Sequence, residues 1–386
     1  MPQTISGLRQ AISNERLGLK FLGTLFLLAL VATGFAAYQI YAPVGPADST
    51  NDADATYVDI APGTPTEAIA RQLERAGVLR SRYAFDLLRA VKRGKLIAGE
   101  YRFNHPANAL EVYARILHGD VYTIAVSIPE GYNLFDIAQT VANTGLATRD
   151  DFLTAERSQT KLVADLAPNA TSLEGYLFPD TYRFPRHTTP DQMLAAMVKR
   201  FRQTAAQLDL TQLSPEDLNR TVILASLIEK EVRQDSERPL VASVFTNRLA
   251  QNMPLATDPS VIYAALRANR YRGTIYESDL QSPSPYNTYR HPGLPPGPIA
   301  NPGIAALRAA ISPAHTDYLY FVADAEGHSQ FSATLQQHDQ QVATYRRALN
   351  PPPPPPVHAP ARSRSRSQAH ARPNAHARAH THAHTR

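Results

Sequence analysis

The feature that most constrains this chain is a run of 21 uncharged, mostly apolar residues near its N-terminus, residues 21–41 (FLGTLFLLALVATGFAAYQIY). As an α-helix this run extends about 30 Å, which matches the hydrocarbon core of a bilayer. Positive charge dominates before it and acidic residues follow it: Arg9, Arg16 and Lys20, then Asp48, Asp52 and Asp54. The positive-inside rule therefore predicts a single transmembrane helix with residues 1–20 in the cytoplasm.

A cleaved signal peptide is the alternative interpretation of the same run. The run is longer than a signal-peptide core of about 7–15 residues, and the Ala-Ala-Tyr near its end is a poor cleavage site. We therefore expect an uncleaved anchor in the cell (inner) membrane. In either case the rest of the chain lies on the periplasmic or extracytoplasmic side.

The positive charge of the chain is concentrated at its C-terminal end. The formal net charge is +5, but residues 351–386 hold six arginines and no acid, so the remainder is close to −1. A six-proline run followed by Arg-Ser and Ala-His repeats predicts a disordered tail over 350–386. Since this tail follows an exported region, we expect no nucleic-acid partner. The absence of cysteine excludes disulfides and thiolate metal sites.

Between anchor and tail, the patterning predicts an α+β protein. Residues 42–56 read as a linker, 57–150 as small strand–helix units, and 151–349 as a mixed α+β domain. In the first region, strands are expected near 58–60, 99–103 and 123–128 and helices near 64–76, 83–91, 109–117 and 134–144. In the second, helices are expected at 190–208, 220–234, 238–251, 259–269 and 339–349, with a buried strand at 318–322.

The helix expected over 220–234 contains the most informative residue. At about 100° per residue, Glu231 falls on the same face as Leu224 and Leu227, whereas Glu229 falls on the opposite face. We therefore expect Glu229 to be solvated and Glu231 to be partly buried. A buried carboxylate either pairs with a cation or has a raised pKa, and a raised pKa suits a general acid. An ion pair with Arg233, Arg238 or Arg248 is the alternative.

Loop residues further along the chain are candidates for substrate contact. Asp258 precedes Pro259 and is expected to cap a helix, with substrate contact as the alternative. Between 282 and 303, prolines and glycines surround tyrosines and asparagines, which offer flat faces and paired donors and acceptors for sugars. Rigid Pro-rich packing is the alternative here. The candidates in this segment are Tyr286, Asn287, Tyr289 and Asn301.

Several motifs in one order resemble the endolytic murein transglycosylases of the YceG-like family. The resemblance covers about 57–348. The matching runs are EGYLFPDTY at 174–182, ASLIEKE at 225–231, ASVFTNRL at 242–249, LATDPSVIY at 255–263, YNTY at 286–289, GLPPGPI at 293–299 and YLYFV at 318–322. The resemblance implies a LysM-like module over 57–150 and an α+β catalytic domain over 151–349. It also implies that Glu231 is the catalytic glutamate.

The same resemblance implies a reaction. Glu231 is expected to cleave the β-1,4 bond between N-acetylmuramic acid and N-acetylglucosamine in peptidoglycan glycan strands and to leave a 1,6-anhydro end, without cofactor or metal. Glu174 and Asp258 are the candidates for a second carboxylate. Peptidoglycan synthases are expected partners at the level of the family. A hydrolytic muramidase and a non-catalytic wall-binding or division scaffold are the alternatives.

Overall fold

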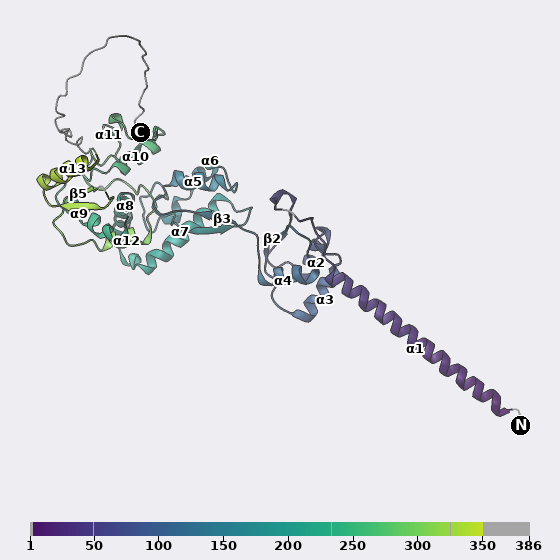
Figure 1. The fold of residues 1–386 in the computed structure, drawn as a ribbon. Helices are drawn as coiled ribbons and strands as arrows, with labels where there is room; N and C mark the ends of the chain where they lie inside the picture. The colour runs from purple at the N-terminus through teal and green to yellow at the C-terminus, as the bar shows by residue number, and fades with distance from the viewer. Residues whose placement is uncertain (1–2, 49, 233, 325, 350–386) are drawn as a thin grey trace, which may run out of the picture.

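A computed structural model describes residues 3–48, 50–232, 234–324 and 326–349, with side chains from residue 20 onward except Asp52. The tail predicted over 350–386 lies outside the described residues. Figure 1 shows an elongated arrangement in which a long N-terminal helix leads into a small module and then into a larger body. The helix, α1, spans Gln3–Tyr41. Its segment Lys20–Tyr41 is long and apolar enough to cross a membrane, and none of its most apolar window is buried.

The small module has its own hydrophobic core. Two antiparallel strands pair with Val58 opposite Tyr101, and three helices pack on them because each buries one apolar face. Helix α4 begins with a capping box in which Asn108 and Glu111 satisfy each other's backbone N–H groups. The elements are β1 (Thr56–Ile60), α2 (Thr66–Arg75), α3 (Arg82–Lys92), β2 (Gly99–Phe103) and α4 (Ala109–His118).

The segment predicted as a free linker is attached to this module. Val44 and Ala107 exchange backbone hydrogen bonds of 2.9 and 3.0 Å, and a short 3₁₀ turn, η1, forms at Asp52–Asp54. Ile40, near the end of α1, packs against the module core. The linker prediction for 42–56 is therefore wrong in part, because backbone pairing holds its first residues against the module.

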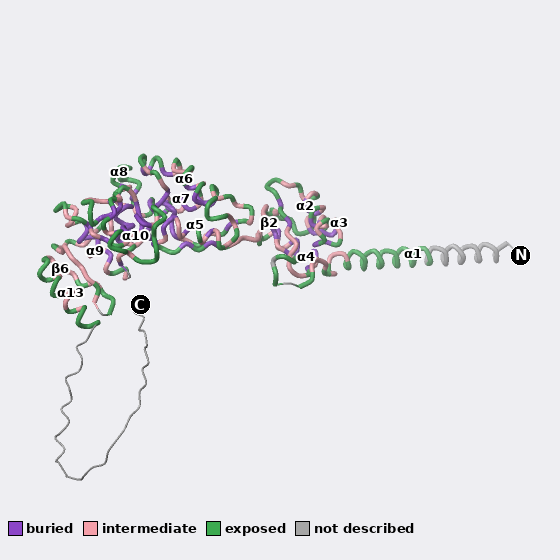
Figure 2. Tube along the Cα trace, turned by 90° about the horizontal axis from the view of Figure 1, so that it is seen from above, coloured by how far each residue is buried: buried purple, intermediate pink, exposed green. Residues whose placement is uncertain are grey.

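The hydrophobic cores divide the chain before Ile124 and not at residue 150 as the sequence patterning indicated. Strand β3 (Ile124–Ser127) pairs with β4 (Thr181–Phe184), so it is hydrogen-bonded into the second body. Helices α5 (Leu134–Asn143) and α6 (Arg149–Ser158) also contribute to the core of that body. Figure 2 shows the two buried regions as separate clusters. The strand–helix pattern of the sequence is similar before and after Ile124. The boundary is recognised only from the pairing of β3 with β4, which is distant in sequence.

The larger body is mainly helical around one extended core. Its long helices lie close to where the sequence predicted them, with bounds that differ by a few residues. They are α7 (Pro190–Gln207), α8 (Pro215–Glu231), α9 (Arg238–Ala250) and α10 (Asp258–Arg267); the shorter helices α11 (Glu277–Leu280) and α12 (Ile304–Ile311) were not predicted. Short 3₁₀ turns join several of them: η2 (Thr160–Val163), η3 (Leu210–Gln212) and η4 (Asp235–Glu237).

Helix α8 is the centre of this body. Every residue from Val222 to Ile228 is buried, because α9, α10 and α12 all pack against the helix. The chain after α12 forms a hairpin, β5 (Tyr320–Ala323) and β6 (Ser329–Ser332), followed by α13 (Leu335–Leu349). The predicted buried strand at 318–322 is thus a half-buried edge hairpin: β5 pairs with β6 alone among the described strands.

Ion pairing at Glu100 joins the module to the larger body. Glu100 on β2 is 5% exposed, and its carboxylate accepts two hydrogen bonds from the guanidinium of Arg186, just beyond β4. The same guanidinium lies 3.5 Å from the ring centroid of Tyr57 on β1. A bidentate, partly desolvated contact of this kind restricts the angle between the two bodies.

Candidate active site

Glu231 is the last residue of α8, and the backbone becomes extended at Val232. The side chain is half-buried and faces an open cleft of about 420 Å³. Among the described residues, no hydrogen bond or ion pair reaches the Glu231 carboxylate. The cleft is lined by Glu231, Arg248, Leu255, Ala256, Thr257, Asp258, Tyr289, Tyr320, Phe321, Leu335 and His338.

The environment of Glu231 favours its protonated form. Burial, together with the negative charge of Asp258, raises the pKa of Glu231 from 4.5 to about 7, against an opposing effect of Arg248. The C-terminal end of α8 acts in the same direction, since that end of a helix carries partial negative charge. A carboxyl group with a pKa near neutrality can both give and take a proton at pH 7.

Arg248 lines the same cleft, and within the part of the chain that the structure describes its guanidinium forms no ion pair. Its Nε donates to the carbonyl of Leu319 at 2.6 Å and its Nη1 to the carbonyl of Leu255 at 2.9 Å. The guanidinium also lies 5.3 Å from the ring centroid of Tyr320. Neutral carbonyls and an aromatic face hold the cation in place while leaving its charge available to Glu231.

Asp258 lies in the cleft and does not cap α10. The N-cap is Thr257, and Asp258 is the first helical residue, where its carboxylate faces the Tyr289 hydroxyl. That hydroxyl donates to Asp258 Oδ1 at 2.7 Å. Burial and this hydrogen bond raise the pKa of the Tyr289 phenol, which therefore stays protonated as the donor. The capping expectation is wrong; substrate contact, the alternative, stays a prediction for a residue that lines the cleft.

The Glu229 side chain is buried, whereas the sequence predicted that it is solvated. Its carboxylate, with a side chain 5% exposed, pairs with Arg238 at 3.1 Å and accepts the Gly303 N–H at 3.0 Å. The prediction of a solvated Glu229 fails because α8 is covered on all sides and not along one stripe. Arg238 is therefore engaged by Glu229 and Asp235, and the ion pair proposed as an alternative for Glu231 does not form with it.

Glu174 and Asn301 lie in the interior and not in the cleft. Asn301 Oδ1 accepts the N–H groups of Gly175 and Leu177, both at 2.9 Å, while its Nδ2 donates to Glu174 Oε1 at 2.8 Å. Glu174 also accepts the Leu134 N–H at 2.9 Å, and burial raises its pKa to about 8. Their burial, 2% and 0% exposed, removes both from direct substrate contact in this structure.

Tyr286 and Asn287 organise the loop that presents Tyr289. Asn287 is fully buried, donates to the carbonyls of Leu280 and Ser282, and accepts the Tyr289 N–H at 3.1 Å. Tyr286 is 8% exposed, and its hydroxyl accepts a hydrogen bond from Arg267 at 2.9 Å. Both residues are therefore buried and support the loop, and of the candidates in this segment Tyr289 lines the cleft.

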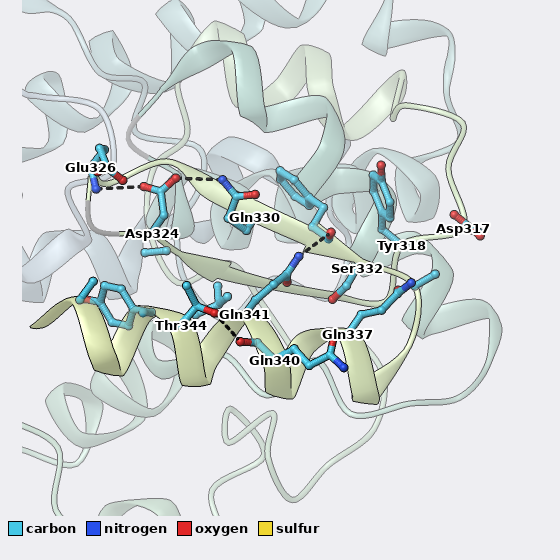
Figure 3. Close-up of a pocket in the computed structure, with 16 residues that line it drawn as sticks. Asp317, Tyr318, Asp324, Glu326, Gln330, Ser332, Gln337, Gln340, Gln341 and Thr344 are labelled. Atoms are coloured by element: carbon cyan, nitrogen blue, oxygen red, sulfur yellow. Dashed lines mark hydrogen bonds between the residues drawn. The ribbon is translucent and has the colours of Figure 1, made fainter. Parts of the chain in front are cut away.

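A second, larger cavity of about 870 Å³ lies between the β5–β6 hairpin and α13. Figure 3 shows it lined by amide side chains such as Gln330, Gln337 and Gln341, with Asp324 at one end. Hydrogen bonds from Gln330 and from the His328 and Glu326 N–H groups lower the pKa of Asp324. A carboxylate stabilised in its ionised form is a poor general acid, so the Glu231 cleft is the better candidate for catalysis.

Two residues of the cleft, Tyr320 and His338, were not predicted from the sequence. Arg248 was considered only as an ion-pair partner of Glu231 and not as a cation held by backbone carbonyls. Tyr320 was visible in the YLYFV run, but its face could not be assigned without the hairpin partner. His338 stacks on Tyr320, with ring centroids 5.3 Å apart, and α13 carries no signal that would have singled it out. Among the described residues, no group of three or more His, Cys, Asp or Glu side chains could hold a metal ion.

Comparisons with known proteins agree on one family. The sequence model of the YceG-like family matches residues 58–344. An endolytic murein transglycosylase of Bacillus subtilis is 32% identical over 313 residues, covering 76% of this chain and 85% of that protein. One from Streptococcus pneumoniae is 31% identical over 354 residues, covering 83% of this chain and 64% of that protein. A crystal structure of a yceG-like protein from Listeria monocytogenes superposes with a TM-score of 0.50 at 32% identity, covering 74% of this chain and 98% of the other.

Proposed function

The chain belongs to the YceG-like family, and we propose that it is an endolytic murein transglycosylase in which Glu231 is the catalytic acid and base. The observation that carries the proposal is the position of Glu231. It is a carboxyl group with a pKa near 7, free of an ion pair among the described residues, at the edge of an open cleft. The relatives supply the substrate class, which is peptidoglycan glycan strands.

In the proposed reaction, protonated Glu231 donates its proton to the glycosidic oxygen between N-acetylmuramic acid and N-acetylglucosamine. The C1–O bond breaks and positive charge develops at C1 of the muramic sugar. The carboxylate then takes the proton of the muramic 6-hydroxyl, whose oxygen bonds to C1 and closes a 1,6-anhydro ring. The proton gained returns Glu231 to its starting state, so one carboxyl group serves both steps.

Arg248 and Asp258 would act on this cycle through charge. Arg248 stabilises Glu231 in the interval when it is ionised, and Asp258 favours the protonated form needed at the start. Hydrolytic glycosidases usually use two carboxyl groups, about 5–5.5 Å apart in retaining enzymes and about 6.5–9.5 Å apart in inverting ones. Asp258, held by Tyr289, is the second carboxyl of the cleft, and it would become the candidate base if the enzyme were a hydrolase.

The cleavage products test the proposal. Detergent-solubilised full chain is incubated with purified peptidoglycan and with uncrosslinked strands, and the new ends are identified by mass spectrometry. Wild type and Glu216→Gln, a change at an exposed glutamate of the same helix, should release 1,6-anhydro ends. Glu231→Gln should lose activity by about 10²–10⁴-fold. Reducing ends would identify a hydrolytic muramidase, and no release from wild type would favour the scaffold.

We further propose that α1 anchors the enzyme in the cell membrane, with the module and larger body outside. Support comes from the apolar Lys20–Tyr41 segment and the basic residues before it. The LysM-like character of the module is proposed from the family resemblance and from its compact β1–α2–α3–β2 unit. Partnership with peptidoglycan synthases is supported by the resemblance alone. Protease protection of either end in sealed vesicles tests the orientation.

A further inference from the structure

Helix α3 of the module has two apolar faces. The inner face packs into the module core and includes Phe85 and Leu88. The other face carries Tyr83, Leu87 and Val91, which are 68%, 49% and 73% exposed. These residues are spaced four apart, so they form one continuous stripe along the helix. Single exposed apolar residues are ordinary, but an aligned stripe marks a surface that meets an apolar partner.

Basic residues are frequent in the sequence around this stripe. Between residues 80 and 95 there are six bases and one acid, Asp86. Arg82 donates to the Tyr83 hydroxyl at 2.9 Å and stacks over its ring at 4.9 Å, so the phenol and the guanidinium form one amphipathic unit. The bases are Arg80, Arg82, Arg89, Lys92, Arg93 and Lys95. An apolar stripe bordered by cations is the composition of helices that lie in the headgroup region of anionic membranes.

The module is joined to α1 so that α3, which carries this stripe, lies next to the end of the apolar segment. Helix α3 contacts α1, and Arg80 donates to the Pro43 carbonyl at 3.2 Å while its guanidinium lies 4.9 Å from the Tyr38 ring centroid. Figures 1 and 2 both place α3 at the end of the module from which α1 departs. The 22 residues of Lys20–Tyr41 span about 33 Å, which brings Tyr38 and Tyr41 to the interface when the segment crosses a bilayer.

We propose that α3 is a membrane-contacting helix: Tyr83, Leu87 and Val91 enter the outer leaflet and the surrounding bases bind anionic phospholipid headgroups. The inference rests on the proposed anchoring by α1, and it adds a second attachment point. With two attachments, one through α1 and one through α3, the module is held in a fixed orientation at the membrane surface. The Glu100–Arg186 pair then carries that orientation to the larger body.

Tryptophan fluorescence tests this contact directly, because the chain contains no tryptophan. Full-length Tyr83→Trp and Val91→Trp variants are reconstituted in nanodiscs with phosphatidylglycerol, with or without brominated acyl chains, which quench tryptophan on contact. Phe26→Trp in α1 reports insertion of the anchor. Tyr271→Trp, at an exposed tyrosine of the larger body, is the matched control. We expect at least about twofold quenching at positions 83, 91 and 26, and none at 271.

Adding Leu87→Glu and Val91→Glu to the Tyr83→Trp chain should abolish its quenching while Phe26→Trp in the same background stays quenched. If Tyr83→Trp is not quenched while Phe26→Trp is, the inference is overturned and the proposed anchor is retained. The stripe would then be a surface for docking a protein. Unquenched Phe26→Trp would overturn the anchor itself. Equal quenching in phosphatidylcholine discs would overturn the role of the bases. Release of glycan ends by the same samples reports the enzymatic activity separately.

Discussion

At Glu231 two neighbouring charges act in opposite directions. Asp258 and burial favour the neutral carboxyl group, whereas Arg248 favours the carboxylate. A group that must donate a proton and then retrieve one works best when neither form is strongly preferred at the working pH. The cleft provides that balance with fixed charges, since Tyr289 holds Asp258 and backbone carbonyls hold Arg248.

The first prediction concerns the pH dependence of cleavage. Because Glu231 must be protonated to begin the reaction, kcat/KM should fall as pH rises through its pKa near 7. Asp258→Asn removes the neighbouring negative charge and lowers that pKa, so the falling limb should move to lower pH. Relative to wild type, the variant should lose a few-fold to about tenfold more activity at pH 8 than at pH 5. The measurement is kcat/KM for release of glycan ends across pH 4–9.

Arg248→Met provides the opposing comparison. Loss of the cation should raise the pKa of Glu231 and move the falling limb to higher pH, whereas Arg248→Lys should restore most of the wild-type profile. If kcat/KM falls at the same pH in wild type and in all these variants, the fall is caused by the titration of a group other than Glu231. In that case the assignment of Glu231 as the acid would fail on kinetic grounds.

The same raised pKa predicts a cost in stability. The native state holds the Glu231 proton up to about pH 7, whereas the unfolded chain releases it near 4.5, so wild type loses stability as pH rises between these values. Glu231→Gln has no such titration and should be more stable than wild type by about 3 kcal/mol at pH 8 and similar to it at pH 4. Urea unfolding at both pH values measures the difference. A constant difference would contradict the raised pKa.

At the scale of elements, the 297–303 loop is joined to the 174–178 segment by buried hydrogen bonds. Gly175, at φ +88°, lies so close to Pro298 that an added Cβ would be 2.5 Å from its side chain. Asn301 then links the two segments by accepting two N–H groups and donating to Glu174. Ile299 N–H also donates to Ser226 on α8 at 3.1 Å, so this assembly supports the helix that carries Glu231.

Asn301→Ala should therefore be a stability mutation and not a binding mutation. It leaves the Gly175 and Leu177 N–H groups buried without acceptors, which costs about 2–5 kcal/mol. Urea unfolding should show this loss, while KM of the folded fraction stays near the wild-type value. Asn143→Ala, at an exposed asparagine of α5, is the control and should change stability little. If Asn301→Ala leaves stability unchanged and raises KM, Asn301 contacts the substrate and the structural role proposed for it is wrong.

Sequence reasoning identified most elements because their local periodicity matched their final environment, as for α7 and α9. It also singled out Glu231 as a partly buried carboxyl group, and its side chain is half-buried at the end of α8. It misjudged Glu229, Asn301 and Asn287, because a polar residue that ends in the interior is identified only by its partners, which are distant in sequence. Asp258 shows the same limit: Asp-Pro is typical of a cap, and the Tyr289 hydroxyl that faces it is 31 residues away.

At the scale of the whole molecule, the position of the candidate active site relative to α1 depends on two small joints. The module is tied to the end of α1 by Val44 and Ala107, and the larger body is tied to the module by Glu100 and Arg186. Each contact removes a degree of freedom between the anchor and the Glu231 cleft. A buried carboxylate that loses its cation is strongly unfavourable, so the second joint should resist bending.

Arg186→Met tests whether this joint holds the two bodies at one angle. The chain lacks cysteine, so Ala61→Cys on the module and Gln207→Cys on α7 can carry a pair of spin labels without other changes. With Arg186 present, pulsed electron paramagnetic resonance of the full chain in nanodiscs should give one narrow distance distribution. Arg186→Met removes both hydrogen bonds to Glu100 and leaves the His187 ring, at 3.7 Å, as its basic neighbour, so the distribution should widen or split as the joint opens. Arg183→Met, three residues earlier and exposed, is the matched control and should leave it unchanged. A narrow distribution in the Arg186 variant would mean that backbone contacts alone set the angle, and the ion pair would then have no part in positioning the active site.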